Sequence, residues 1–82
     1  MNEMKKFIVV LNLWQGDGRI LVHNADSHFG EFFKEADAQT FNDGALICRV
    51  LGRLEAANPE ELKSKVSALG LGKVEYQDSW DE

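Results

Sequence analysis

The sequence predicts an α+β fold: a small antiparallel sheet, built from an N-terminal β-hairpin and a C-terminal edge strand, with two or three helices packed on one face. Three observations indicate this class. Residues 7–14 form an apolar segment that is followed by a glycine-rich turn and a second apolar segment, as in a hairpin. Residues 40–54 carry apolar side chains at helical spacing, and residues 58–70 combine helix start and stop signals. Residues 1–82 are expected to fold as a single compact domain, because a chain of this length supports one hydrophobic core.

The expected hairpin begins with a strand at residues 7–14. This segment is almost continuously apolar and rich in β-branched side chains, which is typical of a strand that is covered on both faces. Residues 16–18 are Gly-Asp-Gly and supply the positive φ angles that a tight hairpin turn needs, so residues 19–23 are expected to return as the second strand. Trp14 is expected to pack in the core.

Residues 24–39 fit two structures, of which a helix is slightly favoured. Four apolar residues follow the spacing of a helix face: Phe29, Phe32, Phe33 and Ala36. Asp26 or Ser27 would then cap the helix. Against a helix, Gly30 would lie in its first turns, and the alternation of phenylalanine with glutamate over residues 29–35 also suits a third strand.

The segment at residues 40–54 is expected to form the central helix of the fold, because almost no position on it is left for solvent. Its apolar stripe consists of Leu46, Ile47, Val50, Leu51 and Leu54. A second stripe of small side chains consists of Ala45, Cys48, Gly52 and Ala56. The side chains left for water are Arg49, Arg53 and Glu55. A helix with two such faces packs against two layers, and Thr40 with Asp43 resembles the capping box that would start it.

Residues 58–61 predict the start of another helix, because an asparagine cap is followed by a proline and two glutamates. The buried edge of this helix is expected to consist of Leu62, Val66 and Leu69. Gly70 suits the left-handed conformation that ends a helix. Residues 73–77 alternate, with Val74 and Tyr76 inward, and predict a short edge strand.

The charge of the chain is negative and unevenly distributed. The net charge is -5, and the excess of carboxylates lies in two blocks, residues 26–37 and residues 75–82. One interpretation is that these blocks only keep a small domain in solution. The other interpretation is that the blocks dock on a basic protein surface, with Trp80 as an exposed aromatic anchor. Alternatively, Trp80 folds back on the edge of the sheet, and the chain then lacks that anchor. The docking hypothesis assigns partner binding to Glu31, Glu35, Asp37, Glu75, Asp78, Trp80, Asp81 and Glu82.

The sequence carries no motif for catalysis, a cofactor or a metal, so none of these is expected. His23 and His28 have neither the spacing of a helical metal pair nor the cysteines of a zinc finger. The adjacency of Asp26, Ser27 and His28 is no evidence for a triad, because triads are assembled from separate elements. The single Cys48 excludes an intramolecular disulfide and is expected to be a small buried hydrophobe.

The balance of charge disfavours direct binding to nucleic acid, because Lys and Arg contacts to phosphates supply much of that affinity. The apolar run after Lys5 and Lys6 is too short for a signal peptide, and no segment is a candidate membrane span. We therefore expect a cytoplasmic location without membrane binding.

The profile favours a stoichiometric protein-binding module that occupies a basic surface of a partner, such as a surface that binds nucleic acid. In general character, a small acidic domain of this kind resembles the inhibitors encoded by phages and mobile elements, such as anti-CRISPR proteins, nucleic-acid mimics and immunity proteins; no motif of one family carries the resemblance. The alternative is a subunit or accessory protein of an oligomeric assembly, a homodimer included, that uses the small-residue helix face. A third hypothesis is a small-molecule or enzymatic site near Trp14, His23 and His28.

Overall fold

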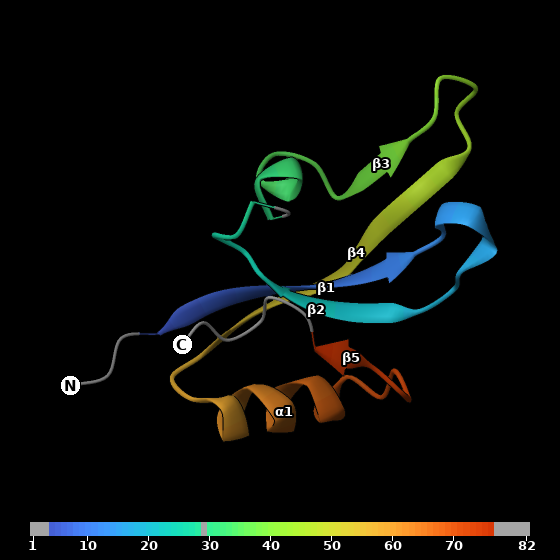
Figure 1. The fold of residues 1–82 in the computed structure, drawn as a ribbon. Coiled ribbons are helices and arrows are strands. Elements are labelled where there is room, and N and C mark those ends of the chain that lie inside the picture. The colour runs from blue at the N-terminus through green and yellow to red at the C-terminus, as the bar shows by residue number, and fades with distance from the viewer. Residues whose placement is uncertain (1–3, 29, 77–82) are drawn as a thin grey trace.

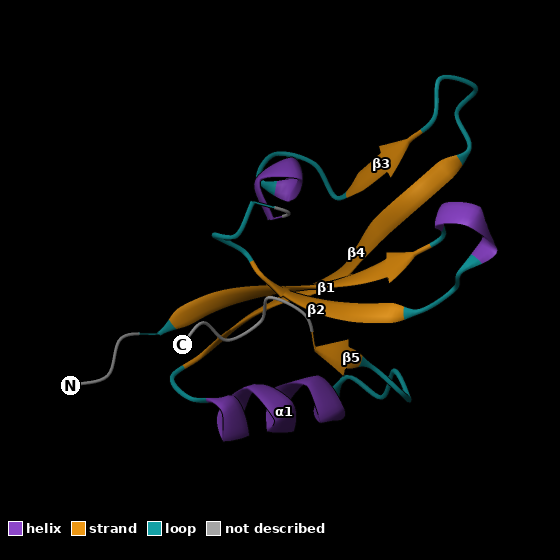
Figure 2. Cartoon of the chain, in the orientation of Figure 1, coloured by secondary structure: helices purple, strands orange, loops and turns teal. Residues whose placement is uncertain are grey.

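The computed structural model describes residues 4–28 and 30–76 of the chain (Figure 1). The strands are β1 (Lys5–Asn12), β2 (Ile20–Asn24), β3 (Ala38–Thr40), β4 (Leu46–Ala56) and β5 (Glu75–Tyr76). The helices are the α-helix α1 (Pro59–Ala68) and two short 3-10 helices, η1 (Trp14–Gly16) and η2 (Gly30–Phe33). The strands form one sheet, with α1 below it and η2 above it in the view of Figure 2.

The strand order is β3-β4-β1-β2-β5, and the neighbours are antiparallel except for β2 and β5, which are parallel. Both β2 and β4 run antiparallel to β1 and therefore share a direction. The crossover through α1 returns the chain in the direction of β4, which makes β5 parallel to β2. The N-terminal hairpin is confirmed, but residues 13–19, which include η1, connect its strands in place of the predicted tight turn at residues 16–18. The C-terminal edge strand is confirmed at Glu75–Tyr76, where Tyr76 is exposed and not inward as predicted. The prediction of an antiparallel sheet with two or three helices on one face is wrong, since α1 is the one α-helix among the described residues.

The predicted central helix is wrong, because this segment forms β4 and the turn before it. β4 is covered by η2 on one face and by α1 on the other, so the strand needs apolar side chains on both faces. Its pairing with β1 contains a bulge at Leu51: Gly52 lies opposite Val9, and the next paired residue, Val50, lies opposite Val10. Before the bulge, even-numbered residues of β4 lie on the η2 side of the sheet; after it, even-numbered residues lie on the α1 side. This switch interrupts the alternation of a strand and leaves apolar residues at the spacing of a helix.

The small residues of the predicted helix do not share one face. Cys48 packs in the core under η2, whereas Ala56 packs in the core under α1. Ala45 is exposed in the turn before β4, and a Cβ on Gly52 would lie 3.6 Å from the side chain of Leu69. The surface that the oligomer alternative requires is therefore absent from this part of the chain.

Residues 41–45 form the turn that connects β3 to β4. The Phe41 N–H donates to the Ala45 carbonyl at 2.8 Å, the Ala45 N–H donates to the Asp43 carboxylate at 2.9 Å, and Gly44 adopts a φ of +88°. The predicted capping box is wrong, since Asp43 caps a turn and not a helix. Asp-Gly between two apolar segments is itself a sequence signal for a hairpin.

Residues 24–39 form neither the favoured helix nor a continuous strand. A turn leads into the single turn of η2, and a second turn leads into β3. Gly30 is buried, and a Cβ at this position would overlap the backbone carbonyl of Ala25. Within η2, Phe33 is 1% exposed and Phe32 is 56% exposed, so the two adjacent rings face opposite directions.

Each face of the sheet carries a hydrophobic core. The buried residues on the α1 side are Phe7, Val9, Val22, Ala56, Leu62 and Val66. The buried residues on the η2 side are Ile8, Val10, Phe33 and Cys48. β1 contributes two residues to each core, which confirms the prediction that this strand is covered on both faces.

α1 begins and ends at the predicted residues. The Asn58 side chain accepts a hydrogen bond from the Glu61 N–H at 2.8 Å, and Pro59 occupies the first turn. Gly70 follows with a φ of +69°. The predicted burial of Leu69 is wrong, because 43% of this residue is exposed.

Gly30→Ala is expected to lower the free energy of unfolding by roughly 1–3 kcal/mol, because the added methyl group has no room against the Ala25 carbonyl. Chemical denaturation followed by circular dichroism measures this change. Gly52→Ala is the matched control, since its methyl group would make only an ordinary contact with Leu69. Equal destabilisation by the two substitutions would contradict the close packing of Gly30.

Candidate functional site

The residues predicted to bind a partner fall in separate places. Glu31, Glu35 and Asp37 lie on η2 and the turn that follows it, above one face of the sheet. Glu75 lies on β5, at the sheet edge opposite to β3. The remaining predicted residues lie outside the described part of the chain: Asp78, Trp80, Asp81 and Glu82. The structure therefore brings three of the predicted carboxylates together.

The three carboxylates belong to the same short segment as an exposed phenylalanine. Phe32 is 56% exposed, and the ring of His28 lies edge-on to it with 6.1 Å between the centroids. We call Glu31, Phe32, Glu35 and Asp37 the acidic ridge. An apolar side chain surrounded by charged groups is the arrangement found at the centre of many protein interfaces.

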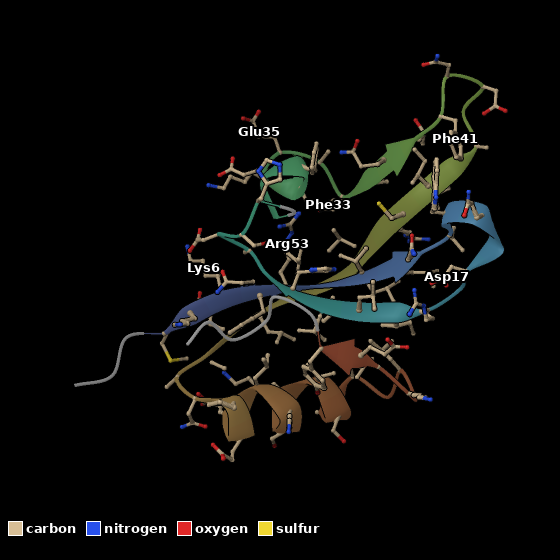
Figure 3. All side chains as sticks on the ribbon, viewed as in Figure 1. Lys6, Asp17, Phe33, Glu35, Phe41 and Arg53 are labelled. Carbon is tan, nitrogen blue, oxygen red and sulfur yellow. The ribbon has the colours of Figure 1, made fainter. Side chains whose placement is uncertain are left out.

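Contacts to the sheet hold the acidic ridge in place. Phe33 is buried in the core beneath η2. Arg53 extends from β4 toward the ridge, where its Nη2 donates to the Phe33 carbonyl and to the Asp37 carboxylate, each at 2.6 Å (Figure 3). Gln39 Nε2 donates to the Phe32 carbonyl at 2.9 Å. A surface that is ordered before binding loses less conformational entropy when it binds.

Ion pairs within the chain reduce the charge of the acidic ridge. Lys34 lies 3.3 Å from Glu31, and Arg53 lies 2.6 Å from Asp37, so three ridge carboxylates meet two cations. The side chains of Glu31 and Asp37 are still 59% and 76% exposed. Exposed ion pairs are weak and are screened by salt, so cations of a partner can replace these. The ridge is nevertheless less acidic than the sequence suggests.

Glu75 belongs to a different cluster. Arg19 lies between two carboxylates, with its Nη1 at 3.3 Å from Glu75 and its Nε at 2.8 Å from Asp17. The cluster connects β5 to the loop between β1 and β2. Glu75 therefore shares no surface element with the acidic ridge.

A second exposed aromatic surface lies where the β1–β2 loop meets the β3–β4 turn. The rings of Trp14 and Phe41 stack with 5.3 Å between their centroids, and the two residues are 46% and 39% exposed. The Leu13 N–H donates to the Ile47 carbonyl at 2.8 Å beside this pair. The prediction that Trp14 packs in the core is wrong, because its main partner is another exposed ring.

Two adjoining hollows lie between η2 and the first residues of β1. Their volumes are about 310 and 230 Å³, and both are lined by Lys6 and Arg53. Lys34 and Asp26 also line the larger hollow, and Glu55 also lines the smaller one. Charged side chains dominate the larger hollow, whereas Phe7, Ile8, Ala25 and Leu54 give the smaller hollow a largely apolar lining. At about 230 Å³, the smaller hollow is below the usual size of small-molecule sites.

The remaining reactive side chains do not form one site. His23 is buried on β2, and Cys48 is buried on β4, where burial raises the pKa of its thiol and disfavours the reactive thiolate. Trp14 lies at the β1–β2 loop and His28 lies beside the acidic ridge, so the residues of the third hypothesis are separated. Residues 4–28 and 30–76 contain no group of three or more His, Cys, Asp or Glu side chains that would hold a metal ion.

Phe32 is the candidate binding residue that the sequence pattern misplaces. Helical spacing assigns both Phe32 and Phe33 to one buried face. η2 is a single 3-10 turn with about three residues per turn, so adjacent side chains lie about 120° apart around its axis. Phe33 takes the core side, and Phe32 is left in solvent. No local sequence signal separates the exposed ring from the buried one.

Comparisons with protein families, with curated proteins and with solved structures find no match to this chain. No helix in the described residues combines the length and the apolar composition needed to cross a membrane.

Arg53→Gln is expected to loosen the acidic ridge, because it removes donors to the Phe33 and Ala36 carbonyls and to Asp37. Backbone amides of residues 33–37 should exchange faster in an NMR hydrogen-exchange experiment, and the free energy of unfolding should fall by about 0.5–1.5 kcal/mol, because these contacts are at most partly buried. Arg49→Gln, on the exposed side of the same strand, is the matched control and should leave both values unchanged. Unaltered exchange in the Arg53 variant would show that the ridge is held by other contacts.

The pKa of Asp17 should lie below the ordinary value of 3.8, chiefly because the Arg19 side chain donates a hydrogen bond to its carboxylate. NMR titration of the carboxyl carbon measures this pKa, and Arg19→Gln should raise it. A lowered pKa in the folded state means that the contact stabilises the fold at neutral pH and is lost as the pH falls through that pKa. The same pKa in both proteins would contradict the assignment.

Proposed function

We propose that this chain is a protein-binding module that docks its acidic ridge on a basic surface of a partner protein. The observation that supports the proposal is the exposed ring of Phe32, which shares a short segment with Glu31, Glu35 and Asp37. Hydrogen bonds from Arg53 fix this segment to the sheet. Covering an exposed aromatic ring in a complex removes apolar surface from water and so favours binding.

The two kinds of side chain in the ridge have different roles in the proposed mechanism. The carboxylates steer a cationic partner toward the ridge and set its orientation. Phe32 then enters an apolar recess of the partner, where full burial of a phenylalanine contributes about 1.5–3 kcal/mol relative to exposure. Arginine or lysine side chains of the partner replace the internal pairs of Glu31 and Asp37. The contribution of the C-terminal residues 78–82 stays a prediction.

A stoichiometric inhibitor of the phage or mobile-element kind is the form of this function that we favour. The acidic ridge supplies charge and one aromatic ring, so it would inhibit a partner by covering a site on it. Such a site could be the surface with which the partner binds nucleic acid. We place the interaction in the cytoplasm, in keeping with the single cysteine of the sequence.

The proposal is tested by capture of a partner on the immobilised chain from an extract of the producing cells, followed by calorimetric titration of the purified pair. Phe32→Ala should weaken the affinity by about tenfold or more, since a central aromatic anchor contributes above 1 kcal/mol. Glu31→Gln with Glu35→Gln should lower the association rate and the dependence of the affinity on salt.

Two variants provide matched controls. Phe41→Ala removes an exposed ring outside the ridge, and Glu60→Gln removes an exposed carboxylate on α1; both should bind like the unmodified chain. Binding that is insensitive to Phe32→Ala, or that does not respond to ionic strength, would refute the proposal. Because Phe32 and both glutamates are exposed, these substitutions should leave the fold intact.

A further inference from the structure

The edge of β4 that faces away from β1 is only partly paired. β3 pairs with β4 as far as Arg49, and the Val50 N–H donates to the Asp37 carbonyl at 2.7 Å. From residue 51 to residue 56, no other strand of the described chain lies along this edge (Figure 1). An unpaired strand edge is a template for another strand.

Arg53 and Glu55 direct their backbone groups toward this open edge. The Lys6 carbonyl accepts a hydrogen bond from the Ala25 N–H, so Lys6 faces β2. In an antiparallel pair, the backbone N–H and C=O groups of two opposite residues point either toward each other or both outward. Glu55 lies opposite Lys6, whose backbone groups point away from β4. The backbone groups of Glu55 therefore point away from β1. Arg53, two residues earlier, faces the same way. Lys65 Nζ donates to the Glu55 carbonyl at 2.6 Å, as this direction requires.

The order of the edge residues is self-complementary. If a second copy of β4 pairs antiparallel with the first about a two-fold axis at Leu54, Arg53 of each copy lies opposite Glu55 of the other. These residues would exchange four backbone hydrogen bonds, and each Arg53 would face an opposite charge. A shift of one residue in the axis would place Arg53 opposite Arg53, or Glu55 opposite Glu55. The charges therefore favour one register.

The flanking side chains are compatible with this pairing. Leu54 is half-buried on the α1 side of the sheet, and a second Leu54 would cover it at the axis. Leu51 and Leu69 are exposed near the same edge. The hydrogen bond from Lys65 to the Glu55 carbonyl does not block the pairing, because the carbonyl oxygen has two lone pairs and can accept a second hydrogen bond. The Lys65 ammonium also lies 3.8 Å from Glu61, which keeps it near this position.

We propose that the chain self-associates into a two-fold dimer in which the β4 edges pair antiparallel about Leu54, so that two sheets form one continuous sheet. The occupant of the edge is a second copy of this chain, because the sequence Arg-Leu-Glu presents opposite charges to itself when it is reversed. The surface differs from the small-residue helix face and from the acidic ridge, and it does not depend on the proposed function.

Sedimentation velocity of the purified chain, from micromolar to millimolar concentration, tests the proposal. The sedimentation coefficient should rise from the monomer value toward the dimer value. In parallel, the amide protons of Arg53 and Glu55 should exchange more slowly as the concentration increases, because the second copy supplies acceptors that no other strand of the described residues supplies. A chain that stays monomeric over the whole range would overturn the proposal.

Glu55→Pro is the decisive variant, because it removes an N–H that faces the open edge and leaves the hydrogen bonds to β1 in place. It should be monomeric at every concentration while its circular dichroism spectrum is unchanged. Glu55→Gln keeps the N–H and removes only the two charge pairs, so it should weaken the dimer by roughly two- to thirtyfold. If the proline variant does not fold, Glu55→Arg replaces it: arginine opposite Arg53 should abolish the dimer at low salt and partly restore it at high salt.

A dimer that persists in folded Glu55→Pro, or in Glu55→Arg at low salt, would show that the contact lies elsewhere and would overturn the proposal. Concentration-dependent protection of other amides, with those of Arg53 and Glu55 unchanged, would do the same. These measurements use the purified chain alone, so their failure leaves the proposed partner binding through the acidic ridge unaffected.

Discussion

Strand β1 is apolar on both of its faces, and the rest of the fold supplies a cover for each of them. Phe7 and Val9 need one layer, and Ile8 and Val10 need another. In the described part of the chain, α1 covers the first face, and η2 with the turns around it covers the second. The second layer is irregular, and Phe33 is the ring that its described residues bury in the core. Surface segments that are held by few buried contacts are those in which binding residues are usually found.

The acidic ridge connects this irregular layer to the proposed function. Arg53 and Phe33 fix the ridge from beneath, and the same backbone geometry turns Phe32 toward solvent. Arg53 has its backbone at the open edge of β4 and its guanidinium on the ridge. Arg53 would therefore take part both in partner binding through the ridge and in the pairing of two β4 edges. A dimer would present two ridges on one face of a continuous sheet. Two linked ridges would bind a repeated or symmetric partner more tightly than one.

The sequence predicts those elements whose local signals agree with their surroundings. The β1–β2 hairpin and α1 belong to this group, since the Gly-Asp-Gly turn, the Asn58 cap and Gly70 act locally. β4 does not belong to this group. A strand covered on both faces has apolar residues on both, so it lacks the alternation of polar and apolar residues, and its bulge shifts which positions face each side of the sheet. The Asp43–Gly44 turn is the local signal that opposes a helix there. Three ridge carboxylates could be predicted from charge alone. The exposure of Phe32 could not be predicted, because it depends on how Gly30 packs against the Ala25 carbonyl and not on charge or helical spacing.

The bulge at Leu51 has a consequence for how the sequence can change. On the C-terminal side of the bulge, odd-numbered residues such as Arg53 lie on the η2 side; on its N-terminal side, even-numbered residues such as Cys48 and Val50 do. Removing one residue from the bulge would turn Cys48 and Val50 away from Phe33 and direct Arg49 toward the core. The number of residues in the bulge is thus constrained more tightly than their identity. Homologous chains should differ in the residue at position 51 and rarely in the number of residues there.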